Sequence, residues 1–318
     1  MRGVRISSVL RFMRTYTRLT GYPVPAPPGF ASAWSRGLNI DDKGSSMLLF
    51  TGALYQLVPY INATVRLLSI AEERGLSNIL SVLEGLAALR PGALQGLVRP
   101  ERRDLEESEK ILRSIVNALR SSGVRFSYDP RVSDMYSGAL ILDYGVADEL
   151  KEHAKRVSEA IEAGGYETVI TVDPHTTLTL MSYRQLVGLK VNVVNYLELV
   201  RPLKRVRLTA TVHDSCIYAR DLNLWGKARE LLKGSGVSVV EPRNYGPKTF
   251  CCGGPVESLS PGLANAIAKR RVAELREAAD VAITMCPICL SNLRRAGGNV
   301  IDLSVVIGGD AEGSVTRP

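Results

Sequence analysis

The distribution of cysteine is the feature that most constrains this chain. Five cysteines occur in 318 residues, and all lie in the last third: Cys216, Cys251, Cys252, Cys286 and Cys289. Their spacing is C-x34-C-C-x33-C-x-x-C. An odd number of cysteines confined to one segment argues against a disulfide framework. The pattern instead predicts that the C-terminal third folds around a metal or redox site.

The spacing also discriminates between kinds of site. Cys286 and Cys289 form a C-x-x-C turn, which is used for zinc, iron–sulfur clusters and dithiol redox chemistry. A thioredoxin-like dithiol would leave three cysteines without a role. The adjacent Cys251 and Cys252 cannot easily both bind one tetrahedral zinc ion, whereas a cluster accepts adjacent thiolates on different irons. The pattern therefore favours an iron–sulfur cluster, with zinc as the alternative and inert buried cysteines as a third interpretation.

Three segments carry a resemblance to a known family: His213–Cys216, Cys251–Gly254 and Thr284–Cys289. They resemble the three parts of the cysteine-rich CCG domain, which is found in heterodisulfide reductase and in the iron–sulfur subunits of glycolate oxidase and related dehydrogenases. The resemblance implies that the five cysteines bind one non-cubane [4Fe–4S] cluster. Ser215 stands where the family usually has proline, and Ile217 where histidine is common, but neither change removes a ligand.

The sequence also contains an internal duplication. Val169–Leu178 aligns with Ala282–Ser291, and Leu49–Tyr55 aligns with Val212–Tyr218. In both copies short β-branched runs alternate with longer helical patterns, which is typical of βαβ units and parallel sheets. We therefore predict an α/β fold of two pseudo-symmetric lobes with mostly parallel sheets, and a cluster in loops of the C-terminal lobe. Gly75–Arg103 is interpreted as an insertion in the first copy.

This interpretation divides the chain into three parts: an arginine- and proline-rich arm at 1–45, a degenerate lobe at 46–200, and a cluster-binding lobe at 201–318. Four prolines between residues 23 and 28 predict an arm with little helix in its middle. Strands are predicted over residues 48–50, 124–127, 167–172, 207–212, 237–240 and 281–285. Amphipathic helices are predicted over residues 146–163 and 261–279.

The first lobe lacks thiolate ligands. The positions equivalent to the five cysteines hold Ala53, Tyr136, Ser137, Asp173 and Thr176. Asp173 and His175 are two potential ligands, but two residues do not complete a metal site, and we interpret Asp173-Pro174-His175 as an ordinary turn. The first lobe is therefore expected to be a scaffold or docking surface, and the chain to carry a single cluster.

Several residues near the cysteines are candidates for a role in chemistry. His213 and Asp214 directly precede Cys216 and are predicted as catalytic residues that hydrogen-bond a cluster sulfur or a bound thiol; loop capping is the competing interpretation. Tyr218 and Arg220 are assigned to the mouth of the site. Arg243 and Lys248 are assigned to offsetting the negative charge of the cluster.

Composition narrows the functional class. Forty Lys and Arg against 32 Asp and Glu give a net charge of +8, but the basic residues are spread and form no nucleic-acid-binding motif. No secretory signal or membrane-spanning run is found, so a cytoplasmic protein is expected, with peripheral membrane contact left open. We predict an iron–sulfur electron-transfer subunit that is inactive alone and pairs with a flavoprotein or ferredoxin-type subunit. The alternatives are a thiol/disulfide reductase and a non-redox zinc-bound assembly subunit.

Overall fold

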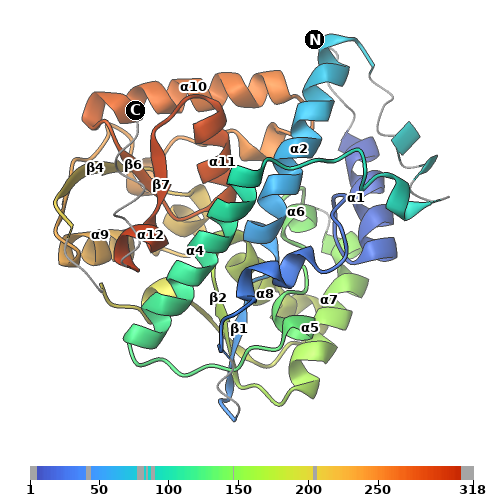
Figure 1. Cartoon of the computed structure of the whole chain (residues 1–318), viewed down its shortest axis with the longest axis horizontal. Coiled ribbons are helices and arrows are strands. Elements are labelled where there is room, and N and C mark those ends of the chain that lie inside the picture. The colour runs from blue at the N-terminus through green and yellow to red at the C-terminus, as the bar shows by residue number, and fades with distance from the viewer. Residues whose placement is uncertain are drawn as a thin grey trace.

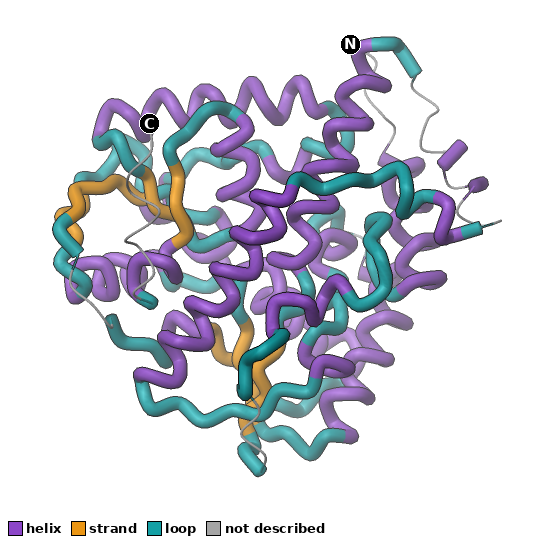
Figure 2. Tube along the Cα trace, in the orientation of Figure 1, coloured by secondary structure: helices purple, strands orange, loops and turns teal. Residues whose placement is uncertain are grey.

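The computed structural model describes residues 6–40, 44–76, 82–83, 85–86, 90–145, 147–202 and 206–308. The strands gather in two separate places, and helices surround each group (Figure 2). Each group is one sheet, of three and four strands respectively. The predicted α/β class with two lobes is confirmed. The lobe boundaries drawn from the sequence remain a prediction.

The N-terminal sheet consists of three parallel strands: β1 (Met47–Phe50), β2 (Thr168–Thr171) and β3 (Asn192–Asn195). β2 lies in the middle, and its Val169 and Ile170 are fully buried. The run predicted as a strand at 124–127 makes only one parallel bridge, between Ser127 and Leu48 of β1. That bridge occupies the edge of the sheet beyond β1.

The C-terminal sheet has four parallel strands: β4 (Leu208–Val212), β5 (Val237–Val239), β6 (Ala282–Thr284) and β7 (Val300–Asp302). Their order is β5-β4-β6-β7. The N-terminal lobe has the same order, with the Ser127 bridge in place of β5 and then β1, β2 and β3. The sheets therefore repeat one topology, as the internal duplication predicts.

Helices cover both sheets (Figure 1). Those of the N-terminal lobe are α2 (Leu54–Glu73), α4 (Arg102–Ser121), α5 (Pro130–Ser133), α6 (Ala139–Leu142), α7 (Ala147–Ala163) and α8 (Pro174–Val187). Those of the C-terminal lobe are α9 (Trp225–Gly234), α10 (Pro261–Ala278), α11 (Pro287–Arg295) and α12 (Leu303–Ile307). The predicted helices correspond to α7 and α10. Within the described residues, no helix is both long enough and apolar enough to cross a membrane.

The connections after the first strand of each lobe differ in length, and the predicted insertion lies between two helices of the longer one. Between β4 and β5 lie a π-helical turn (Ile217–Asp221) and α9, whereas the long helices α2 and α4 both precede the Ser127 bridge. Residues 77–81, 84 and 87–89 of the predicted insertion lie outside the described residues. α4 packs against α2 of its own lobe and against α12 of the other (Figure 1), so this helix joins the two lobes.

The N-terminal arm contains a helix that the proline content does not predict, α1 (Ile6–Thr20). Its buried residues Val9, Phe12, Met13 and Tyr16 recur at intervals of three and four, which places them on one face. The proline-containing middle of the arm, residues 21–29, is not helical, as predicted. Residues 1–5 and 41–43 of the arm lie outside the described residues.

Two hydrogen bonds between buried side chains relate the lobes by pseudo-symmetry. Tyr55, at the start of α2, donates to Asp302 Oδ2 at the end of β7 over 2.7 Å. Asn195, at the end of β3, donates to the Tyr218 hydroxyl over 2.9 Å. Tyr55 and Tyr218 occupy equivalent positions in the duplication, as do the ends of β3 and β7. The carboxyl ends of the two sheets therefore face each other, and in open parallel sheets this is the edge where sites form.

Candidate metal centre

The cysteines lie in loops and helix starts that follow strands of the C-terminal sheet. Cys216 comes after β4 and directly precedes a π-helical turn, Ile217–Asp221. Cys286 follows β6 and is the N-cap of α11, where its sulfur accepts a hydrogen bond from the Cys289 backbone N–H over 3.5 Å. Cys286 thus lies at a helix N-terminus, whose partial positive charge stabilises its thiolate.

The vicinal pair is positioned by two glycines. Gly253 has a φ of 89°, and a Cβ at this position would lie 2.6 Å from the carbonyl oxygen of Ala264. A Cβ on Gly254 would lie 2.5 Å from a methyl carbon of Ile288. The Gly253 backbone N–H also donates to Cys251 Sγ over 3.4 Å. The glycines therefore let the loop pack against α10 and α11, which brings the vicinal cysteines to the C-x-x-C turn.

The five thiols form one continuous group. Side-chain hydrogen bonds connect them in the order Cys216, Cys251, Cys252, Cys289, Cys286. None is in a disulfide; Cys252, Cys286 and Cys289 are buried, while Cys216 and Cys251 are partly exposed. The predicted ligand residues thus come together, with one edge of the group toward solvent.

The thiols perturb one another's ionisation. Hydrogen bonds from Cys216 and then Cys252 lower the pKa of Cys251 to about 2. Burial raises the pKa of Cys286, but a hydrogen bond with Cys289 and the charge of His175 outweigh it and hold that pKa well below its usual range. Hydrogen bonding to Cys251, burial and nearby thiolate charge raise the pKa of Cys216. Packed this closely, the thiols form a donor set suited to a cation or a cluster.

His213 lies beside this group and presents a nitrogen to it. Ligand atoms of His213, Cys252 and Cys289 lie within 4.8 Å of one another. The Arg271 Nε–H donates to His213 Nδ1 over 3.1 Å, and within the described residues Nε2 has no hydrogen-bond partner. Burial and Arg271 lower the pKa of His213 to about 3, so the ring is neutral. Because Nδ1 accepts, the proton of the neutral ring is on Nε2, which makes His213 a potential hydrogen-bond donor beside the thiols.

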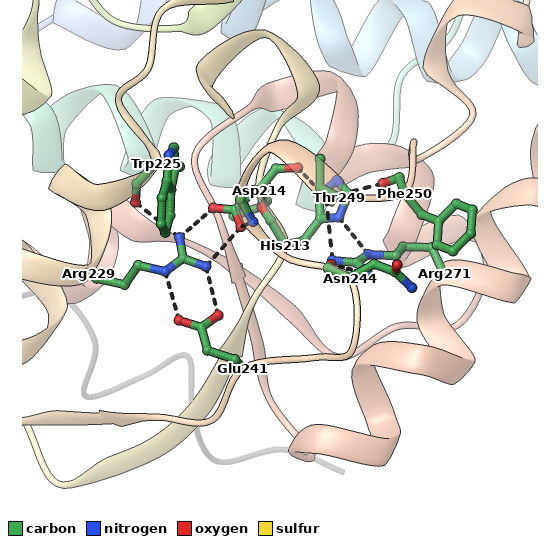
Figure 3. A network of polar contacts seen from close by, with 11 residues as sticks. His213, Asp214, Trp225, Arg229, Glu241, Asn244, Thr249, Phe250 and Arg271 are labelled. Atoms are coloured by element: carbon green, nitrogen blue, oxygen red, sulfur yellow. Dashed lines mark hydrogen bonds and ion pairs between the residues drawn. The ribbon is translucent and has the colours of Figure 1, made fainter. Parts of the chain in front are cut away.

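Arg271 anchors His213 from α10 (Figure 3). Its guanidinium is buried, donates to the Asn244 carbonyl oxygen over 2.9 Å, and forms an ion pair with Glu274 at 2.8 Å. The carboxylate of Asp214, the other predicted catalytic residue, has different partners. It accepts two hydrogen bonds from Arg229, at 2.5 and 2.8 Å, and one from the Gly246 backbone N–H at 2.6 Å (Figure 3). These contacts favour the loop-capping interpretation of Asp214.

The other candidates occupy different places around the site. Arg220 donates to the carbonyl oxygens of Pro247 and Thr249, and so braces the loop that leads to Cys251. Tyr218 is buried at the lobe interface. Arg243 and Lys248 are exposed.

In the first lobe, the positions equivalent to the cysteines also converge, but small polar side chains pack directly against one another. Ser137 Oγ lies 3.3 Å from Thr176 Oγ1, and a Cβ on Gly52 would lie 2.3 Å from that same Thr176 oxygen. Asp173 caps α8 through the Thr176 backbone N–H, as Cys286 caps α11. The equivalent position of the first lobe is thus filled by protein.

One functional candidate is absent from the predicted site residues. His175, interpreted from the sequence as part of an ordinary turn, lies in the first turn of α8 and hydrogen-bonds to Cys286 of the other lobe. Its Nδ1 is 2.8 Å from Asp143 Oδ2. That interpretation is incomplete because the contact joins distant parts of the chain. The only sequence signal is the alignment of Asp173-Pro174-His175 with Cys286-Pro287-Ile288.

Comparison with known proteins agrees with this geometry. Residues 210–294 match the family model of the CCG cysteine-rich domain. The chain is 25% identical over 152 residues to the EtfAB:quinone oxidoreductase of Syntrophomonas wolfei, a match that covers 42% of this chain and 21% of that protein. It is 26% identical over 199 residues to the probable iron-sulfur-binding oxidoreductase FadF of Bacillus subtilis, covering 58% and 28% respectively. The chain thus spans less than a third of the length of these relatives.

Among solved structures, the Picrophilus torridus aspartate racemase aligns with 65% of this chain and 90% of its own, at 12% identity and a TM-score of 0.30, too low to indicate a shared fold. The family match covers all five cysteines and the strand β6 between the vicinal pair and the C-x-x-C turn. The C-terminal part of this chain, residues 210–294, is therefore a cysteine-rich domain of the CCG family.

Proposed function

We propose that the chain is an iron–sulfur electron-transfer subunit of a larger oxidoreductase, with one cluster bound by Cys216, Cys251, Cys252, Cys286 and Cys289. The observation that carries the proposal is the convergence of five reduced thiols from three separate segments into one group. When bound, such a cluster accepts and passes on single electrons. A non-cubane [4Fe–4S] form is the type that five thiolates with a vicinal pair suit best.

The tautomer of His213 argues against a zinc site made from His213, Cys252 and Cys289. A histidine that binds a metal almost always donates its other ring N–H to an acceptor. His213 does the reverse, since its Nδ1 accepts from Arg271. To bind zinc through Nε2, the ring would have to move its proton to Nδ1, where two donors would then face each other, or lose it and become a buried anion. As a donor, His213 suits a cluster whose sulfurs need hydrogen bonds.

The surrounding residues prepare the site in other ways. The backbone N–H groups of Gly253 and Cys289 donate to Cys251 and Cys286, which favours the thiolate forms. The buried guanidinium of Arg271 lies behind His213 and adds positive charge near an anionic group. The partly exposed edge at Cys216 and Cys251 is where electrons would enter or leave.

The cysteine count and the net charge of the 318 residues suggest the kind of partner. All five cysteines are assigned to one cluster, and we propose that the second redox group, another cluster or a flavin, lies outside these residues. The relatives named above include an oxidoreductase that acts with EtfAB and quinone. An acidic flavoprotein or ferredoxin-type protein is the partner that a chain of net charge +8 would suit.

An electron-transfer experiment tests this function. The anaerobically purified chain is reduced with dithionite and mixed with an oxidised flavoprotein or ferredoxin, at low and at high salt, while visible absorption is followed. We expect single-electron reoxidation that slows as salt rises, because screening weakens electrostatic association. Cys251→Ser should lose the signal. Steady turnover of NADH or a 2-hydroxy acid by the chain alone, without a carrier, would overturn the proposal.

A further inference from the structure

His175 links the cysteine-free lobe to the thiol group of the other lobe. It lies in the first turn of α8, directly after β2, and its side chain is 9% exposed. On one side it meets Asp143, at the end of α6, and on the other it meets Cys286. The lobe that has lost its own cysteines thus supplies a side chain to the site that keeps them.

The local sequence explains why His175 reaches across. Asp173 is the N-cap of α8 and Pro174 its first residue, just as Cys286 and Pro287 begin α11. His175 is therefore the pseudo-symmetric counterpart of Ile288, and both line a cavity of about 80 Å³ between the lobes. The same cavity is lined by Gly254, two residues after Cys252.

The other walls of that cavity are mainly apolar, with residues such as Phe12 and Met13 of α1 and Val65 of α2. Water competes poorly for hydrogen bonds in such surroundings. A hydrogen bond made there is therefore stronger than one at the surface. The bonds of His175 are therefore expected to persist.

Proton positions follow from the partners. A carboxylate only accepts hydrogen bonds, so His175 Nδ1, 2.8 Å from Asp143 Oδ2, carries a hydrogen. That leaves Nε2 for Cys286, whose sulfur accepts as a thiolate. Asp143 therefore fixes the ring in an orientation that aims an N–H at one cysteine. A carboxylate–histidine pair of this kind is a common way to orient a group around a metal site.

We propose that His175, held by Asp143, is a positioning residue that donates a hydrogen bond to the Cys286 thiolate and thereby raises the reduction potential of the cluster. The inference rests on the proposed function, since it requires a cluster at Cys286. Hydrogen bonds to cluster sulfurs raise the potential because they disperse the extra negative charge of the reduced state. The cysteine-free lobe then has a role in the redox chemistry beyond support.

The test is a potentiometric titration of the full-length chain with its cluster, monitored by electron paramagnetic resonance. His175→Leu should lower the midpoint potential by about 59 mV, which corresponds to a tenfold shift between oxidised and reduced cluster. Iron content should remain at the wild-type level. Asp143→Asn keeps the ring but weakens its support, and should give a smaller shift in the same direction.

The matched control is His153→Leu. His153 is equally buried in the same lobe, but its Nε2 bonds to the Tyr136 carbonyl oxygen. The midpoint potential of the cluster in His153→Leu should equal that of the wild type. An unchanged potential in His175→Leu, with normal iron content, would overturn the inference. If His175→Leu fails to fold or to hold iron, Asp143→Asn is the deciding variant. An unchanged midpoint potential in Asp143→Asn, with normal iron content, would then overturn the inference. Absence of any cluster in the wild type would instead refute the proposed function.

Discussion

Replacing Arg271 with leucine tests the buried network behind His213. Arg271 is 1% exposed and pairs with Glu274, whose side chain is 6% exposed, at 2.8 Å. Removing one partner of a buried ion pair typically costs about 3–5 kcal/mol, because the other charge stays buried. Glu274 keeps two hydrogen bonds from Asn244, at 2.7 and 2.8 Å. We therefore expect a loss near the lower limit, about 3 kcal/mol in the free energy of unfolding.

Urea denaturation of the metal-free chain, with its thiols reduced, measures this loss by far-ultraviolet circular dichroism. Glu274→Gln and the double variant complete a mutant cycle. We expect the double variant to lose less than the sum of the single losses, because the two groups interact directly. Lys269→Ala, at an exposed position of the same helix, is the control and should change stability by less than about 0.5 kcal/mol. A loss below about 1 kcal/mol for Arg271→Leu, or strict additivity, would refute the reasoning.

Two further predictions concern the N-terminal lobe and the lobe interface. Tyr55→Phe should lower the free energy of unfolding by about 1.5–3 kcal/mol, because it removes a hydrogen bond to the buried Asp302 carboxylate; a change within error in urea denaturation would contradict this. Burial lowers the pKa of His153 below 6.5. The unfolded chain therefore takes up a proton that the folded chain refuses, and stability should fall as pH drops below about 6.5, by up to about 1.4 kcal/mol per pH unit. Comparing wild type with His153→Gln between pH 7 and pH 5 isolates this contribution, and identical pH profiles would exclude it.

The sequence predicts the parts of this fold that repeat or that alternate regularly. The bounds of β1, β2, β4, β5 and β6 lie within one residue of those of the predicted strands. β3 and β7 are not among the predicted runs. β3 begins and ends with asparagine and is only partly buried, and β7 ends in an aspartate, so neither has a strong apolar pattern. Helix α1 is not among the predicted helices, because the arginines in its sequence obscure the periodic pattern of its apolar residues.

For the site, the cysteine spacing predicts which residues gather, because each cysteine follows a strand of one parallel sheet. Contacts between lobes have no such local signal. Asp173-Pro174-His175 looks like a helix start, and only the packing of α8 against the other lobe brings His175 to Cys286. Asp214 adjoins His213 in sequence, yet their side chains point to Arg229 and to the thiols respectively.

The metal content of the anaerobically purified chain is the most direct test of the central claim. Iron, acid-labile sulfide and zinc are measured per chain for the wild type and for Cys251→Ser and Cys252→Ser. We predict about four iron and four sulfide in the wild type, with little zinc, and loss or conversion of the cluster in both variants. One zinc per chain without iron, or wild-type iron and an unchanged paramagnetic spectrum in both variants, would contradict a cluster held by the five cysteines.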